Sequence, residues 1–154
     1  MSKVTAIVLT AVVCATAAVT AQEGKRNPYR NYTEEKFVDN MQSGGRNYVA
    51  VNDFISKADF ASAKAQLTRA REQFAVTVQF WRDVNQKDDA IKMLRGVLTG
   101  MDDLDKTLST EPVDAAAVKA TLQRIGSGCQ SCHAVYREQD AATKRFRVKQ
   151  AALK

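Results

Sequence analysis

The sequence predicts an all-α protein, an antiparallel up-down-up-down bundle of four helices. Three observations support this prediction. The 154 residues contain only 2 Pro and 7 Gly, so few positions break a helix. Apolar residues recur at alternating spacings of three and four in four long segments, which is the pattern of an amphipathic helix. Short polar segments separate the four, as the turns of an antiparallel bundle require.

Residues 1–21 are predicted to be a signal peptide. Lys3 precedes an apolar, uncharged run, VTAIVLTAVVCATAAVTA, and small residues stand before Gln22 where a signal peptidase cleaves. Cleavage after Ala21 predicts a periplasmic protein without stable membrane insertion. An uncleaved anchor is the alternative, although the apolar part is short and diluted by Ala and Thr. A lipoprotein acylated at Cys14 fits poorly, because Val precedes the Cys where a small residue is wanted.

Residues 22–32 are a polar lead-in without periodicity, and the first helix is predicted from Thr33 to Lys57. Thr33 is a suitable N-cap, and Glu34 and Glu35 follow in the first turn, where the helix dipole favours acids. The core-facing seam of this helix is Phe37, Met41, Gly44, Tyr48, Val51 and Ile55.

The second and third helices follow the same pattern. Asp59 is the predicted N-cap of the second helix, which runs to about Val84, and Asp88 or Asp89 caps the third after a short polar turn. The second seam is Phe60, Ala63, Leu67, Ala70, Phe74, Val78 and Trp81. The third seam is Ile91, Leu94, Leu98, Met101, Leu104 or Asp105, and Leu108.

The segment STEPVD ends the third helix and opens the fourth. Pro112 suits a first helical position and Asp114 the first turn. The seam continues through Val118, Leu122 and Ile125, and the helix is predicted to end near Ala142. We therefore expect one four-helix domain over residues 33–143. A basic C-terminal tail, residues 144–154, follows and contains the run KRFRVK.

The fourth predicted helix carries GSGCQSCHAVYRE, residues 126–138, with the chain's only histidine. A structural zinc site needs four ligands, and Cys129, Cys132 and His133 have no second Cys or His cluster beside them. A thioredoxin-type pair needs a strand-to-helix context. A disulfide accounts for the thiols but not for the histidine. Covalent haem attachment accounts for all three, because two thiols bond the vinyl groups and the next imidazole ligates the iron.

This motif near the end of a four-helix chain resembles the class II c-type cytochromes, the cytochrome c′ family. In that family the haem-binding motif is C-terminal and is followed by a Tyr/Phe-Arg pair, matched here by Tyr136 and Arg137. The resemblance covers residues 33–138, and the C-terminal motif is its specific part. It implies one covalently attached haem c per chain, with Cys129 and Cys132 as the thioethers and His133 as the proximal iron ligand.

The family is divided by its distal iron ligand. Cytochromes c′ proper leave that side open and bind NO or CO, whereas a low-spin branch places a Met there from the first helix. The sequence NMQSGGRNY resembles the low-spin branch and implies that Met41 is the distal ligand. From spacing alone, Met41 is equally well a core methionine of its seam.

Counting residues along antiparallel helices gives an independent estimate of where each candidate side chain lies along the bundle axis. His133 lies about nine residues before the predicted end of the fourth helix, and Met41 about eight after the start of the first, so their side chains are expected at one height. The same level selects Phe74 or Ala75, and Leu98, as further candidates near the haem. Met101 also lies on a seam but up to about two turns off this level, so it is the second choice of ligand.

Gly44 and Gly45 lie one turn beyond Met41 on the same face. Each costs about 1 kcal/mol relative to Ala inside a helix, so we expect them to leave room for a flat macrocycle. A kink or a close helix–helix crossing is the alternative reason for glycine at these positions.

The resemblance also bears on two basic residues. Lys119 falls where the family often carries a cation that meets a haem propionate. Arg137, one turn beyond His133, either tunes the surroundings of the imidazole or faces solvent. The family's usual Arg one turn before the distal ligand is absent, and Phe37 stands there, which puts the usual propionate contact from the first helix in question.

With both axial positions filled, the sequence predicts an exported one-electron carrier and not an enzyme. The expected partners are redox proteins and, by family analogy, a second copy of the chain, but no nucleic acid. A net charge of +6 suits an acidic partner or simply solubility. One rival is a five-coordinate haem protein that binds NO or CO. The other is a helical binding protein without haem, stapled by a disulfide.

Overall fold

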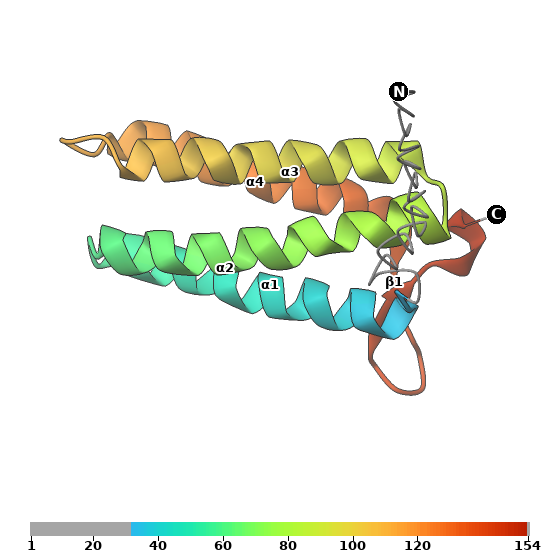
Figure 1. Ribbon diagram of the computed structural model, residues 1–154. Coiled ribbons are helices and arrows are strands. Elements are labelled where there is room, and N and C mark those ends of the chain that lie inside the picture. Colours follow the sequence, from blue (N-terminus) through green and yellow to red (C-terminus); the bar gives the residue numbers. More distant parts are fainter. Residues whose placement is uncertain (1–31, 154) are drawn as a thin grey trace, which may run out of the picture.

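Four long α-helices run alternately up and down in the computed structural model, which describes residues 32–153 (Figure 1). The helices are α1 (Glu34–Ser56), α2 (Phe60–Gln79), α3 (Asp88–Leu108) and α4 (Ala115–Tyr136). α1 packs mainly on α2 and α3 mainly on α4, and contacts between α2 and α3 join the two pairs. The predicted all-α four-helix arrangement is therefore confirmed. The predicted signal peptide and nearly all of the polar lead-in lie outside the described residues.

The N-termini of α1 and α2 are capped as the sequence predicts. Thr33 Oγ1 accepts the backbone N–H of Lys36 at 3.2 Å, and Asp59 Oδ1 accepts that of Ser62 at 3.0 Å. Each bond satisfies one of the N–H groups that an α-helix leaves without an internal partner. Tyr32, the last residue of the predicted lead-in, is already part of the core, at 6% exposure.

The starts of α3 and α4 differ slightly from the prediction. α3 begins at Asp88 itself, after Lys87, so neither predicted aspartate is the cap. Asp114 is the N-cap of α4 and accepts the N–H of Ala116 at 2.8 Å. Pro112 consequently lies before the helix and not at its first position. An aspartate carboxylate competes well for the first free N–H groups, which moves the helix start beyond it.

α2 continues into the π-helical turn η1 (Phe80–Val84), which brings the helical segment to its predicted end. This turn buries both of its aromatic residues, Phe80 and Trp81, at 2% exposure each. A π turn contains one residue more per turn than an α-helix, so it rotates the side chains that follow it relative to the α2 seam.

α4 ends at Tyr136, six residues before the predicted end near Ala142. A hairpin follows, formed by β1 (Arg137–Gln139) and β2 (Phe146–Val148), and the turn η2 (Gln150–Ala152) comes after it. β1 and β2 are antiparallel, with Arg137 opposite Val148 and Glu138 opposite Arg147. Figure 1 shows this hairpin at the end of the bundle where α1 begins.

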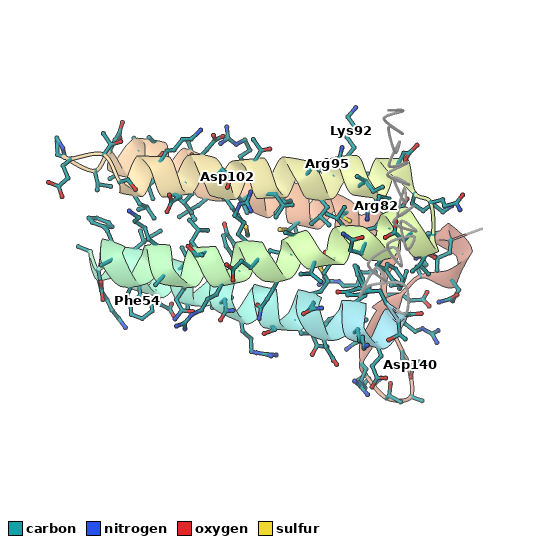
Figure 2. The ribbon with its side chains drawn as sticks, in the orientation of Figure 1. Phe54, Arg82, Lys92, Arg95, Asp102 and Asp140 are labelled. Atoms are coloured by element: carbon teal, nitrogen blue, oxygen red, sulfur yellow. The ribbon has the colours of Figure 1, made fainter. Side chains whose placement is uncertain are left out.

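The hairpin loop is stabilised locally. Asp140 Oδ1 accepts the N–H of Ala142 at 3.1 Å and that of Thr143 at 2.7 Å, an arrangement that competes with helix continuation. Figure 2 shows Asp140 at the outer end of the loop, away from the four helices. The predicted basic tail is therefore in part a folded segment, and its Val148 is buried at 2% exposure.

The core consists largely of the predicted seams. Several helical residues that those seams omit are buried as well, among them Thr77, Ala90, Val97 and Thr121. Gly44 is buried where α1 crosses α2, because a Cβ on it would lie 2.7 Å from the ring of Phe74. A close helix crossing thus accounts for Gly44, and the prediction that it makes room for a macrocycle is wrong.

We expect Gly44→Ala to lower the free energy of unfolding by about 1 kcal/mol. A methyl group forced against Phe74 typically costs about 1–3 kcal/mol, whereas the gain in helix propensity is about 1 kcal/mol. The matched control is Gly96→Ala, an exposed position in α3 where a Cβ meets nothing within 4 Å, and we expect it to stabilise. Urea unfolding of both variants tests this, and equal shifts in the same direction would contradict the crossing.

Candidate functional site

A cavity of about 270 Å³ lies at the end of the bundle where α1 begins and α4 ends. Its walls come from the first three turns of α1, the last turns of α4 and the hairpin, with one residue each from η1 and α3. Most of the lining is apolar, including Phe37, Val38, Trp81 and Leu94. The exposed residues Gln42 and Phe146 also line it, so it opens to solvent on their side.

The cavity brings three of the sequence-predicted ligands together. Met41 reaches it from α1, and Cys132 and His133 reach it from α4. This agrees with the residue count that put Met41 and His133 at one height. Cys129 is not part of the lining, but it packs with Cys132 against the apolar core one helical turn earlier.

Both cysteines are half-buried free thiols. Burial raises the pKa of the Cys129 thiol. Burial, with smaller contributions from Cys129 and Asp89, raises the pKa of Cys132 to about 11. Both sulfurs therefore carry their proton at neutral pH, in contrast to the reactive thiolates of redox-active Cys-x-x-Cys pairs.

His133 is half-buried and faces the cavity as a neutral imidazole. Burial lowers its pKa, and the positive charge of Arg137 lowers it further. A neutral imidazole presents the lone pair that a metal ion requires. His133 is thus in the ionisation state of a metal ligand at neutral pH.

Four aromatic rings form one wall behind the cavity. Phe37 stacks on Phe80 with ring centroids 4.4 Å apart, and Trp81 lies 4.6 Å from Tyr136. Phe37 and Trp81 meet edge to face at 5.1 Å, which links the two pairs. The packed rings exclude water and keep the inner side of the cavity apolar.

Tyr136 also fixes the end of α4 to the start of α3. Its hydroxyl donates a hydrogen bond to Asp89 Oδ2 at 2.6 Å. Burial first, and then this bond, raises the pKa of Tyr136 to about 12. The same bond lowers the pKa of Asp89. Tyr136 lies three positions after His133 on the same face of α4. A hydrogen bond to the charged Asp89 therefore holds this face in place.

The hairpin closes the cavity on the side away from α2 and α3. Phe146, Arg147 and Val148 contribute to the lining. Glu34 in the first turn of α1 accepts the N–H of Val148 at 2.9 Å, and Lys149 N–H donates to the carbonyl of Tyr136 at 2.8 Å. Sequence reasoning missed this wall, although the alternation of basic and apolar residues in RFRVK is the period-two signal of a strand.

The remaining predicted site residues are divided between the cavity and other places. Gly45 lines the cavity, and a Cβ on it would meet nothing within 4 Å, as expected for a position that leaves room. Phe74 and Leu98 do not line it; Trp81 and Leu94 do so instead. The residue count along the helices expected the cavity further from the end of the bundle. The cavity instead extends from Gly45 back to Phe37 in the first turn of α1.

Lys119 is not part of this site. It lies 14 residues before His133 in α4, about 21 Å along the helix at 1.5 Å per residue. Its side chain is exposed. Lys119 does not line the cavity, and the contact with a haem propionate that the resemblance implies for it stays a prediction.

The chemistry of the cavity fits the group that the resemblance implies, a covalently attached haem. Two sulfurs and an imidazole lie on α4, a thioether faces them from α1, and the walls are apolar with space at Gly45. The volume of about 270 Å³ is close to the lower end for ligand pockets, about 300 Å³, and the open side adds room for a larger group.

Other readings of the site find less support. Within residues 32–153, no three His, Cys, Asp or Glu side chains gather closely enough to hold a metal ion. A second cavity between α2 and α3 is polar, and its Asp102 is already paired with Arg71. Across the described part of the chain, no helix has the length and apolar content of a membrane span.

Comparison of the chain with protein-family models, curated proteins and solved structures finds no match. The functional assignment therefore depends on the residues of the site and on their arrangement.

We expect Tyr136→Phe to destabilise the protein at neutral pH and to do so less in acid. The pKa of Asp89 is lowered in the folded state, so the stabilisation that it receives from Tyr136 is present above its unfolded pKa of about 3.9 and is lost as pH falls through the folded pKa. Urea unfolding of both proteins between pH 7 and pH 3 measures the difference.

The control is Tyr48→Phe. The Tyr48 hydroxyl bonds a backbone carbonyl, that of Leu122, at 3.4 Å. This variant has no carboxylate partner to titrate, so its effect should be independent of pH over the same range. A Tyr136→Phe effect that is equally independent of pH would contradict the proposed charged bond.

Proposed function

We propose that this protein is an exported class II c-type cytochrome that carries single electrons on one haem ligated by His133 and Met41. The convergence of Met41, Cys132 and His133 on one apolar cavity from two different helices carries this proposal. These are the residue types that the haem-attachment motif and the low-spin branch require, and nothing in the helical periodicity alone demands that they share a cavity.

Each residue has a chemical role in the proposal. Cys129 and Cys132 would add their S–H bonds across the two vinyl groups and hold the haem to α4 as thioethers. His133, neutral at pH 7, would ligate the iron from the same helix. Met41 would offer its thioether from α1, and a Met ligand raises the reduction potential relative to two nitrogen ligands.

When bound, the haem supplies an Fe(III)/Fe(II) couple that exchanges one electron. The chain contributes a rigid and dry environment for that couple. Phe37, Trp81 and Leu94 keep water from the inner side, and the packing of four helices holds both ligands in place. A site that rearranges little on gaining an electron suits a carrier, and filled axial positions leave no place for a substrate.

The rival gas-binding function requires an open distal face. Met41 lines the cavity from α1, whereas Cys132 and His133 line it from α4, which favours the carrier. The rival without haem requires a structural role for the thiols alone and gives no reason for His133 to face the cavity. The predicted leader supports export to the periplasm.

The attachment chemistry is tested by expression in a host with cytochrome-maturation enzymes. We expect the wild-type chain to retain haem on a denaturing gel, because thioether bonds survive denaturation. The double variant Cys129→Ser/Cys132→Ser should show no haem stain, and Ser127→Ala, an exposed α4 control, should stain as wild type. An unstained wild-type band would contradict the proposal.

The distal ligand is tested by Met41→Leu, which keeps the side-chain volume nearly constant. We expect the low-spin absorption spectrum of the wild type to become high-spin, because leucine cannot ligate iron. Met101→Leu, at a fully buried position outside the cavity, is the control and should leave the spectrum unchanged. A wild-type protein that is already high-spin, and that Met41→Leu does not alter, would favour the gas-binding rival.

A further inference from the structure

The lining of the cavity contains few charged side chains. They are Arg137 and Arg147, both from the hairpin. Haem carries two propionate carboxylates, and a carboxylate that leaves water is stabilised only by hydrogen bonds or a cation. The helix that usually supplies an arginine in the family has Phe37 at that place. A cation for the propionates must therefore be sought on the hairpin.

The strand register separates the two arginines. Arg137 is opposite Val148, whereas Arg147 is opposite Glu138. Since alternate residues of a strand point to opposite faces, Arg137, Phe146 and Val148 share one face and Arg147 lies on the other. Val148 is buried at 2% exposure, whereas Arg137 and Phe146 are exposed, so this face meets the bundle at Val148 and reaches solvent at Arg137.

Arg147 is already engaged on its own face. Its Nε bonds Glu138 Oε1 at 2.8 Å, and its Nη1 lies 3.3 Å from Asp140 Oδ2. Two carboxylates beside one guanidinium leave no net positive charge to attract a third. Arg147 lines the cavity from the edge of the hairpin without being available as a counter-ion.

Arg137 differs from Arg147 in the face that it occupies and in its partners. Its guanidinium carbon lies 4.5 Å from the ring centroid of Phe146, which orients the group at the mouth of the cavity. Among the described residues it has no carboxylate within ion-pair distance. Its planar N–H fork matches a carboxylate in a bidentate geometry.

We propose that Arg137 binds a propionate carboxylate of the haem at the mouth of the cavity. In haem, the propionates lie on the edge opposite the vinyl groups that Cys129 and Cys132 would engage. The proposal rests on the proposed haem function and deepens it by assigning the carboxylate contact to the hairpin in place of α1.

Other charged groups near the cavity have partners of their own. Asp89 accepts the Tyr136 hydroxyl, and Glu34 accepts Val148 N–H and Gln150 Nε2. Lys119 is about 21 Å away along α4. Arg137 is thus the cation at this cavity whose charge is not already balanced by a described carboxylate.

The test uses the full-length, haem-loaded protein and three variants. Arg137→Gln removes the charge, Arg137→Lys keeps it, and Arg147→Gln is the matched control on the opposite face of the same hairpin. The apparent pKa values of the propionates are measured by NMR titration of their carbon signals, together with the reduction potential over the same pH range. Arg137→Gln should raise one propionate pKa by about one unit, because a nearby opposite charge lowers a carboxyl pKa by about 1–3 units.

Arg137→Lys should restore most of the wild-type value, and Arg147→Gln should change it little. The proposal is overturned if Arg137→Gln leaves both propionate pKa values unchanged. It is also overturned if the reduction potential moves equally at every pH, because Arg137 then acts only through His133. Protein without covalent haem overturns the proposed function itself, and this outcome is recognised by its lack of colour before any titration.

Discussion

The antiparallel arrangement of the helices determines where this protein can have a site. In an up-down-up-down bundle the start of the first helix and the end of the last lie at the same end, so residues far apart in sequence become neighbours. Met41 is near the start of α1 and His133 near the end of α4, and both line one cavity. α1 and α2 pack closely where Gly44 contacts the ring of Phe74. The next residue of α1, Gly45, lines the cavity.

The hairpin adds a further wall to this end of the bundle. α4 stops soon after the Cys-x-x-Cys-His segment because the chain turns at Arg137, and the following strands return across the start of α1. The Glu34 carboxylate accepts the N–H of Val148 in β2, and the carbonyl of Tyr136 accepts that of Lys149, the next residue. Val148 itself is buried. The bundle thus supplies the apolar walls together with Met41, Cys132 and His133, whereas the hairpin supplies Arg137 and Arg147.

Periodicity and capping rules predicted the four helices well because each depends on local physics. Thr33 and Asp59 cap the helices that they were expected to cap. The level of Met41 and His133 followed from helix rise alone. Phe74 and Leu98 were misplaced because a residue count cannot locate a cavity along the bundle, and the π turn at Phe80 changes the direction of Trp81. The hairpin was missed because its stabilising contacts, from Glu34 and Tyr136, are long-range.

The central claim is that the sulfur atoms of α4 hold a haem in this cavity. Mass spectrometry of a tryptic digest of the matured protein tests it most directly, because cleavage after Arg124 and Arg137 releases the whole motif as IGSGCQSCHAVYR. The account predicts that this peptide carries the added mass of one haem and that both cysteines resist alkylation. Recovery of the same peptide with two alkylatable thiols, or with a disulfide and no added mass, would contradict it.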